Sequence, residues 1–292
     1  MRLHLVDGTY ELFRAHYSPR PGHESPTGQD LKATVGVVAS LLYLLQDATE
    51  DVTHIAVAFD NPIRSFRNEL YPFYKSDEGV EPALRAQFDA VEEAVRAIGV
   101  AVWSMKDFEA DDGLAAGAAR FRDQVDQVRI MTPDKDLGQC IRGTRVVQVD
   151  RRQLKTTDEA AFRERRGFAP QSMPDYLALT GDAADGFPGL PGFGEKTAGL
   201  LIGAYEHLEA IPLDAARWTV KPRGAAQLVA TLAARLEEAL LFRKLATLDE
   251  AAPVATSLEE VRFRGVPRPD FEAWCRAVGS RTLATVPRRW RG

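Results

Sequence analysis

Short apolar runs in the first half of the chain each lead into an acidic residue. Asp7, Asp60 and Asp134 follow apolar stretches of four to six residues. Such runs alternate with longer amphipathic stretches, a pattern typical of βαβ units and a mostly parallel sheet. Ligands of an open α/β sheet bind in the crevice at the carboxyl ends of its strands. We therefore expect an α/β fold in which acids that are distant in sequence converge at one edge.

The alternation also gives approximate bounds for the elements. Strands are expected near residues 2–6, 54–59, 100–103, 127–131 and 145–149. Helices are expected at residues 31–49, 82–98, 109–122, 158–166 and 225–247. From about residue 167 the pattern is one of helices and turns. Residues 18–30 are predicted to be an exposed loop, and the basic and aromatic stretch 61–81 can bind nucleic acid through phosphate pairing and base stacking.

Nine carboxylates stand where a strand should end or a loop should turn. They are Asp7, Asp60, Glu109, Asp111, Asp112, Asp134, Asp136, Asp182 and Asp185. Like charges packed within a few ångströms raise one another's pKa values or bind cations, and oxygen ligands of this kind suit Mg²⁺ or Mn²⁺. Glu109 and Asp112 are three residues apart in one expected helix, with Asp111 beside them, so at least two of these acids can reach one metal. The set predicts a divalent metal site.

Each part of this set also has an ordinary structural explanation. Acids at 109–112 suit the first turn of a helix, where the helix dipole favours negative charge. Asp134 and Asp136 fit a turn, and Asp182 and Asp185 fit a capped turn. The set as a whole argues for metal binding, because every acid has a turn-side position and no equally regular set of bases neutralises them.

Glycines recur every two or three positions at the start of residues 186–198, ahead of an expected helix. Gly192 and Gly194 let the backbone approach a ligand closely, and the free N–H groups of the following helix can bind a phosphate. One Gly-x-Gly is weak evidence by itself. With Gly189 upstream and an earlier helix before it, the segment predicts a helix-hairpin-helix element that holds the DNA backbone without reading bases.

The composition is that of a soluble globular chain. Hydrophobic residues make up 45% of the 292 residues and charged residues 27%. The net charge of −5 argues weakly against a nucleic-acid partner. Nine of the 42 acids are candidate metal ligands, however, and without them the chain has 33 acidic and 37 basic residues. An acidic balance therefore does not exclude a phosphate backbone as partner.

Cysteines and targeting signals give few further constraints. Cys140 and Cys275 lack metal-type spacing and are expected to stay reduced rather than form a disulfide. The sequence shows no signal peptide and no apolar stretch long enough to cross a membrane. We expect a cytoplasmic protein.

Together these motifs resemble the 5′-nuclease family, which includes the N-terminal 5′-to-3′ exonuclease domain of bacterial DNA polymerase I and the flap endonucleases. The matching segments are Leu5-Val6-Asp7-Gly8, Phe59-Asp60, Ser65-Phe66-Arg67, Tyr74-Lys75, Glu109-Ala110-Asp111-Asp112, Thr132 to Leu137, Ala178 to Asp182 and Gly192 to Ala198. The resemblance runs from residue 3 to about residue 250. No polymerase follows, so the chain looks like a stand-alone nuclease.

The resemblance implies a PIN-like or resolvase-like nuclease core, a mostly parallel sheet flanked by helices, with a helical helix-hairpin-helix subdomain. It implies a catalytic domain at 1–163 with an arch at about 61–90, a DNA-binding subdomain at 164–250 and a basic C-terminal segment at 251–292. The basic residues of that last segment are Arg262, Arg264, Arg268, Arg276, Arg281, Arg288, Arg289 and Arg291. They form either an extra phosphate-binding surface or a solvated tail.

The resemblance also implies roles for single residues. One metal would be held by Asp7, Asp60, Glu109 and Asp111. The second would be served by Asp111, Asp134, Asp136 and Asp185, with Asp112 and Asp182 in supporting or water-mediated positions. Lys75 would lie near the scissile phosphate, and Lys75, Asp111 and Asp134 are the expected catalytic residues. The expected DNA contacts are Arg14, Arg67, Tyr74, Lys75, Arg85, Gly189, Gly192, Gly194, Lys196 and Thr197. A monovalent cation such as K⁺ is expected at the turn 189–197.

Two positions depart from the family pattern. Glu78 stands where many bacterial relatives have a basic residue, so the arch is expected to be rearranged or its substrate preference altered, with Arg85 as a substitute base. Gly186 stands where relatives usually have Asn, which is expected to loosen the turn and spare Asp185.

These observations predict a phosphodiesterase that uses two Mg²⁺ or Mn²⁺ ions on DNA with a 5′ flap, a nick or a free 5′ end. A separate DNA polymerase is the expected partner, and the protein is expected to be associated with the nucleoid. One alternative is an RNA-cleaving nuclease with a related acidic site, against which the hairpin argues. The other is a non-catalytic protein that binds branched DNA, against which the full acid set argues.

Overall fold

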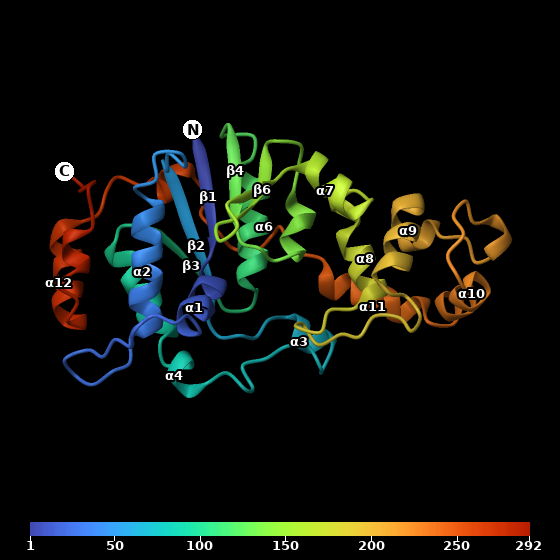
Figure 1. Cartoon of the computed structure of the whole chain (residues 1–292), viewed down its shortest axis with the longest axis horizontal. Helices are drawn as coiled ribbons and strands as arrows, with labels where there is room; N and C mark the ends of the chain where they lie inside the picture. Colours follow the sequence, from blue (N-terminus) through green and yellow to red (C-terminus); the bar gives the residue numbers. More distant parts are fainter.

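A six-stranded sheet lies at the centre of the computed structural model, which describes residues 1–292 (Figure 1). Its strands are β1 (Arg2–Asp7), β2 (His54–Asp60), β3 (Ala101–Met105), β4 (Gln127–Met131), β5 (Val146–Asp150) and β6 (Lys155–Thr157). The order across the sheet is β3-β2-β1-β4-β5-β6, and all pairs are parallel except β5 with β6. The expected mostly parallel sheet is confirmed, and the five predicted strands are correct to within two residues. The short edge strand β6 was not predicted.

Helices surround the sheet and form the rest of the chain. The α-helices are α1 (Gly8–His16), α2 (Lys32–Leu44), α3 (Arg67–Leu70), α4 (Pro82–Arg85), α5 (Phe88–Ala97), α6 (Ala110–Phe121), α7 (Glu159–Arg166), α8 (Met173–Thr180), α9 (Glu195–Tyr205), α10 (Ala225–Ala234), α11 (Leu236–Ala246) and α12 (Arg268–Val278). The 3₁₀ helices are η1 (Asp136–Cys140), η2 (Pro170–Ser172), η3 (Leu208–Ala210), η4 (Ala215–Arg217), η5 (Leu258–Val261) and η6 (Leu283–Thr285).

Three predicted helices were too long. The helix expected at 31–49 ends at Leu44. The stretch 82–98 is broken between α4 and α5, where the buried Gln87 side chain accepts hydrogen bonds from the backbone and the hydroxyl of Thr34 at 3.0 and 3.1 Å. The stretch 225–247 is broken at Arg235, whose backbone leaves the helical region. Apolar periodicity continues across such breaks, so it does not reveal them.

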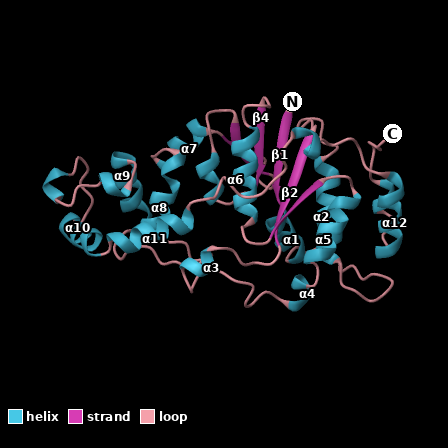
Figure 2. Ribbon diagram, turned by 180° about the vertical axis from the view of Figure 1, so that it is seen from behind, coloured by secondary structure: helices cyan, strands magenta, loops and turns pink.

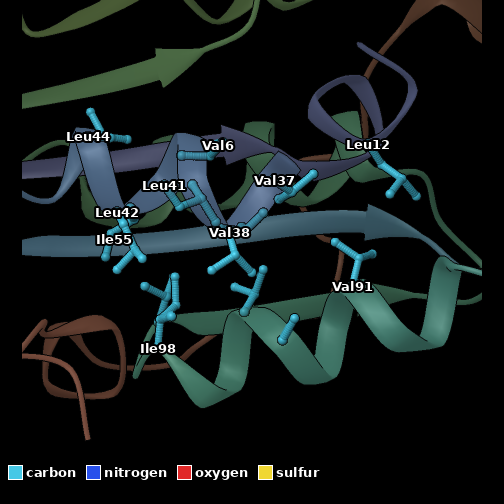
Figure 3. Packing of buried hydrophobic residues seen from close by; sticks show 14 of the residues in the cluster. Val6, Leu12, Val37, Val38, Leu41, Leu42, Leu44, Ile55, Val91 and Ile98 are labelled. Atoms are coloured by element: carbon cyan, nitrogen blue, oxygen red, sulfur yellow. The ribbon is translucent and has the colours of Figure 1, made fainter. Parts of the chain in front are cut away.

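The two faces of the sheet carry two separate cores, as the period of two in a strand requires. Leu3 and Leu5 of β1 pack toward α6, whereas Val6 packs with α2 and α5. Figure 3 shows this second layer, with side chains of α2 and α5 meeting those of β1 and β2. Burial of each such aliphatic side chain contributes about 1.5–3 kcal/mol relative to exposure.

A third core holds the helical part of the chain together, from α7 to α11 (Figure 2). Phe187 and Phe242 stack within it at 5.6 Å between ring centroids. Tyr74, which precedes Lys75 in the stretch expected to be the arch, is buried in the same core. The long segment between β2 and α5 is thus attached to the helical part as well as to the sheet.

The C-terminal segment returns to the far side of the sheet domain, where α12 lies near α2 (Figure 1). Phe271, Cys275 and Leu283 are buried in the core between the sheet, α2 and α5. The segment is therefore packed against the sheet domain through its apolar side chains, while its eight arginines are exposed, so both interpretations of these arginines stay predictions. Cys140 is also buried, and both cysteines are free, as expected. None of the helices is long and apolar enough to span a membrane.

Candidate active site

The strand order places a crevice between β1 and β4. The chain runs from β1 to β2 and β3 on one side of β1 and then crosses to β4 and β5 on its other side. At the point where the strand order reverses in this way, a crevice opens at the carboxyl ends of the strands. A cavity of about 380 Å³ lies there, and its walls include Asp7, Asp60, Lys75, Asp111 and Asp134. The predicted convergence of acids from distant segments is present in the structure.

Asp7 and Asp60 are each held by the N-terminus of a helix: Asp7 by α1, which follows its own strand, and Asp60 by α6, which follows β3. Asp7 ends β1 and is the N-cap of α1, where it accepts a hydrogen bond from the backbone of Tyr10 at 2.8 Å. Thr132 donates its hydroxyl to the other Asp7 oxygen at 2.9 Å. Asp60 ends β2 and accepts a hydrogen bond from the backbone of Ala110 at 2.8 Å. These bonds fix carboxylates that repel one another.

The acids at the start of α6 divide into two groups. Glu109 and Asp112 form a capping box at the N-terminus of this helix. Both Asp112 oxygens accept hydrogen bonds from Arg67, each at 2.7 Å, and Asp112 is fully buried. Asp111 lines the cavity instead. Asp112 is therefore held by the buried guanidinium and does not line the cavity, and the supporting position expected for it stays a prediction.

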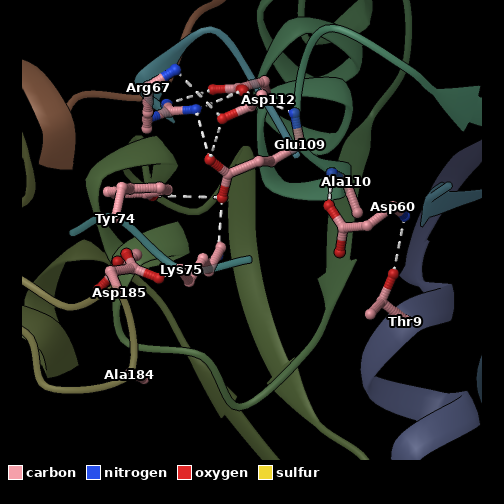
Figure 4. Close-up of polar contacts among 12 residues, drawn as sticks. Thr9, Asp60, Arg67, Tyr74, Lys75, Glu109, Ala110, Asp112, Ala184 and Asp185 are labelled. Carbon is pink, nitrogen blue, oxygen red and sulfur yellow. Dashed lines mark hydrogen bonds and ion pairs between the residues drawn. The ribbon is translucent and has the colours of Figure 1, made fainter. Parts of the chain in front are cut away.

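Lys75 is the cation among these carboxylates. Its Nζ lies 2.7 Å from Glu109 Oε2 and 2.9 Å from Asp185 Oδ1. Figure 4 shows Lys75 and Tyr74 on one side of Glu109 and Arg67 on the other. Burial would raise the pKa of Glu109, but the charges of Lys75 and Arg67 outweigh it and lower that pKa to about 2. Glu109 is thus anionic at neutral pH.

The other acids are less well compensated. Burial raises the pKa of Asp7 from 3.8 to about 7, and the charges of Asp60 and Asp134 add to this effect. Burial is also the main cause that raises the pKa values of Asp111 and Asp136, and Asp134 contributes to both. The site holds more negative charge than its own cations neutralise.

A second cluster lies next to this cavity. Carboxylate oxygens of Asp136, Asp182 and Asp185, all buried, lie within 4.8 Å of one another. Lys135 Nζ is 2.6 Å from Asp182, whereas Asp136 Oδ1 is buried without any hydrogen-bond partner. An unpartnered buried acceptor is costly, and hard oxygen donors suit Mg²⁺ or Mn²⁺. The residues present therefore fit a divalent cation.

Two family models cover nearly the whole chain. Residues 2–167 match the 5′-3′ exonuclease N-terminal resolvase-like domain, and residues 168–269 match the 5′-3′ exonuclease C-terminal SAM fold. The chain belongs to the 5′-3′ exonuclease family. The predicted family and the predicted fold class, a resolvase-like core with a helical subdomain, are both confirmed.

Curated relatives of this 5′-3′ exonuclease family member are longer proteins. DNA polymerase I of Mycobacterium tuberculosis strain H37Rv is 34% identical over 270 residues, which make up 90% of this chain and 29% of the polymerase. DNA polymerase I of Bacillus caldotenax is 30% identical over 282 residues, which make up 95% of this chain and 31% of that protein. The chain thus spans about 30% of the length of these relatives.

Solved structures share the fold of this family member. T5 5′-exonuclease with zinc ions bound matches with a TM-score of 0.63 at 17% identity, and the match covers 97% of this chain and 100% of that one. The catalytic core of Rad2 in complex with a DNA substrate matches with a TM-score of 0.62 at 12% identity, and the match covers 97% and 89% of the two chains.

Several residues expected to contact DNA lie elsewhere in this exonuclease fold. Arg67 is only 1% exposed and Tyr74 is 5% exposed, so neither can reach a strand on the surface. Arg14 lines a separate cavity, where it pairs with Glu11 and donates to Ser40 at 3.1 Å. An Arg or Tyr in a basic, aromatic sequence segment indicates a nucleic-acid contact only if it is exposed, and here tertiary packing buries both Arg67 and Tyr74.

The residues expected to form the hairpin lie in the turn between α8 and α9 and at the start of α9. The turn between α8 and α9 leads into the N-terminus of α9, with Gly192, Gly194 and Lys196 exposed and Thr197 half-buried. Gly189 packs against the preceding turn of the hairpin, because a Cβ at this position would lie 2.3 Å from the backbone nitrogen of Gly181. Gly189 is therefore a packing residue, and the exposed positions beyond it form the accessible turn.

The stretch expected to be the arch carries more exposed acid than base. Asp77 and Glu78 are exposed, and Arg85 lies 3.6 Å from Asp77 and over the Phe88 ring at 4.8 Å. The base expected to replace the missing one is thus partly neutralised. Gly186 tightens the neighbouring turn, contrary to expectation, since its φ is +86° and a Cβ there would lie 2.2 Å from a backbone oxygen of the arch.

Sequence reasoning missed the hydroxyl residues that hold the carboxylates. Thr132 donates to Asp7, and Ser65 donates to Glu109 Oε1 at 2.7 Å. Thr9 accepts the backbone N–H of Asp60 at 2.8 Å. A signal was available for Ser65 and Thr132, which lie within the matched motifs. Their partners, however, are more than 40 residues away in the chain.

Proposed function

We propose that this chain is a structure-specific nuclease that hydrolyses DNA phosphodiesters at a 5′ flap, a nick or a free 5′ end. The main support is the convergence of carboxylates from separate segments around Lys75, in a chain that both exonuclease family models match. Such a set of acids has no evident use in a protein that only binds DNA. A wall of hard oxygen donors beside an ammonium suits the hydrolysis of a phosphate diester.

In this proposal seven carboxylates hold two divalent cations, Mg²⁺ or Mn²⁺. They are Asp7, Asp60, Glu109, Asp111, Asp134, Asp136 and Asp185. When bound, such cations offset phosphate charge and lower the pKa of a water molecule. Asp112 is left out because Arg67 occupies both of its oxygens, and Asp182 has a supporting role because Lys135 pairs with it.

The chain's own residues position the reacting groups. Lys75 lies at the wall of the cavity and would place its ammonium against a phosphate oxygen, where its charge offsets the charge that develops during hydrolysis. Asp111 and Asp134 line the same wall and would orient the attacking water. Asp134 is exposed, so it is accessible to both water and substrate.

Duplex DNA would be held by the hairpin between α8 and α9. The first turn of α9 offers free backbone N–H groups, and Lys196 adds an exposed positive charge. A monovalent cation such as K⁺ would bind backbone carbonyls of the turn 189–197. Recognition would depend on shape rather than sequence, with a separate DNA polymerase as partner and the nucleoid in the cytoplasm as the place of action.

The proposal is tested on 5′-labelled flap, nicked and blunt DNA with Mg²⁺. The wild type is expected to release short 5′ products, and Asp134→Asn is expected to be at least about tenfold slower. Asp158→Asn, which changes the N-cap of α7 away from the cavity, is the matched control. Full activity of Asp134→Asn would refute the assignment. Faster cleavage of a matched RNA flap would favour an RNA nuclease, and binding without turnover would favour a scaffold.

The role of the hairpin is tested separately. Lys196→Ala is expected to weaken duplex binding and to reduce the slope of log affinity against log salt by about 1, while Mn²⁺ affinity stays unchanged. Lys155→Ala, an exposed lysine on β6, is the control. Equal loss of duplex and Mn²⁺ binding in Lys196→Ala would argue against separate roles.

A further inference from the structure

Arg67 is the largest charged side chain that the fold buries. It begins α3, and only 1% of it is exposed. Burying a guanidinium is costly unless it is paired and hydrogen-bonded. The partners of Arg67 must explain why a charged residue is kept in such a place.

All five N–H groups of Arg67 have acceptors. Nε donates to the backbone oxygen of Leu245 at 2.7 Å. Nη1 donates to Asp112 at 2.7 Å and to Glu109 Oε1 at 3.0 Å. Nη2 donates to Asp112 at 2.7 Å and to the backbone oxygen of Thr247 at 2.9 Å. The guanidinium is completely satisfied, and no donor is left for a nucleic acid.

These acceptors come from two parts of the molecule. Glu109 and Asp112 belong to the start of α6 in the sheet domain, whereas Leu245 and Thr247 belong to the end of α11 in the helical part. Arg67 itself lies between β2 and α5. One side chain therefore connects the sheet domain, the segment expected to be the arch and the helical part, and it does so next to Glu109, which pairs with the cavity residue Lys75.

The consequence for Glu109 follows from which oxygen is used. Arg67 and Ser65 both donate to Oε1, at 3.0 and 2.7 Å. Oε2 is turned the other way, toward Lys75 at 2.7 Å and Tyr74 at 3.3 Å. Figure 4 shows this division, with Arg67 above the Glu109 carboxylate and Lys75 below it. The bonds to Oε1 fix the side chain so that Oε2 points at the site.

We propose that Arg67 is a positioning residue: it holds Glu109 in the orientation needed to bind a divalent cation, and it ties that orientation to the helical part through Leu245 and Thr247. This inference rests on the proposed function, since it assumes that the carboxylates bind a cation. Removal of groups that orient metal ligands typically lowers metal affinity by about 10- to 100-fold. A purely structural tie would lower stability and leave metal affinity unchanged.

The test measures Mn²⁺ affinity by titration calorimetry of the full chain, together with the melting temperature. Arg67→Met is expected to bind Mn²⁺ at least about tenfold more weakly. Arg67→Lys is expected to recover part of the affinity, because an ammonium can keep one carboxylate contact but cannot reproduce the planar bidentate pairing. Arg129→Met is the matched control: Arg129 pairs with Glu50 at 2.7 and 2.9 Å, is 12% exposed and lies outside the cavity walls. It should lower the melting temperature and keep Mn²⁺ affinity within about twofold.

A milder variant keeps the proposal testable if Arg67→Met does not fold. Ser65→Ala removes the other donor to Oε1 without unpairing a charge, and it is expected to weaken Mn²⁺ binding by several-fold. If the wild type binds Mn²⁺ and both Ser65→Ala and Arg67→Lys bind it equally well, the positioning role is refuted and the proposed function stands. If the wild type does not bind Mn²⁺, both proposals are refuted.

Discussion

Replacing Asp7 by asparagine is expected to stabilise the metal-free protein. Asp7 is buried, and mainly for this reason its pKa is raised from 3.8 to about 7. Asparagine has nearly the same shape and is an equally good N-cap, so it keeps the bond from the backbone of Tyr10. The substitution removes the charge whose burial is unfavourable and retains the local structure.

The size of the effect follows from the pKa shift. A shift of about three units corresponds to about 4 kcal/mol. Because the pKa is higher in the folded state, the wild type loses this stability as the pH rises from about 4 to about 7. The advantage of Asp7→Asn should therefore be about 1 kcal/mol near pH 4.5 and about 4 kcal/mol near pH 8. At roughly 2–4 °C per kcal/mol, the melting temperature rises by about 8–15 °C near pH 8.

The assay is thermal unfolding in EDTA at both pH values. Asp158→Asn is the control, because Asp158 caps α7 through a bond from Ala161 at 2.9 Å and lies outside the acidic cluster. Added Mn²⁺ should reduce or reverse the difference, since only the wild type keeps the full set of ligands and gains stability by binding. A destabilised Asp7→Asn protein near pH 8, or a difference that does not change with pH, would refute the reasoning.

Three further predictions concern the lysine, the hairpin and the arch. Lys75→Met should lower the free energy of unfolding in EDTA by about 3 kcal/mol, because it leaves Asp185 without its cation and Glu109 with Arg67 alone, and urea titration with and without Mn²⁺ checks this. Gly189→Ala should destabilise by more than about 1 kcal/mol and weaken duplex binding in gel shifts, because its φ is +69° and a Cβ there would clash with the backbone of Gly181. Gly22→Ala, in an exposed loop with open space around the residue, should do neither. Glu78→Arg should tighten binding of a 5′ flap and steepen its salt dependence by about 0.7, as measured by fluorescence anisotropy; an unchanged slope would place the strand away from the arch.

The sheet and its acidic edge could be predicted because both depend on local order along the chain. Alternating apolar runs determine strands, and parallel strands joined by helices place their carboxyl ends together whatever the details of packing. Asp7, Asp60 and Asp134 therefore fell at the cavity as expected. The glycines before α9 likewise indicated the turn, because Gly189 allows a close backbone contact with Gly181 and Gly192 has a positive φ of +89°.

The partners of the buried charges depended on tertiary structure. The sequence predicts that Arg67 contacts DNA, because it lies in a basic and aromatic stretch. In the structure its side chain points inward, where it packs against α6 and the end of α11. Asp112 is then paired with Arg67, whereas its neighbour Asp111 lines the cavity. Tyr74 and the apolar side chains of the C-terminal segment are buried as well. Their burial against segments that are distant in sequence is more favourable than exposure to water. Such contacts join residues more than 40 positions apart, and no periodicity along the chain encodes them.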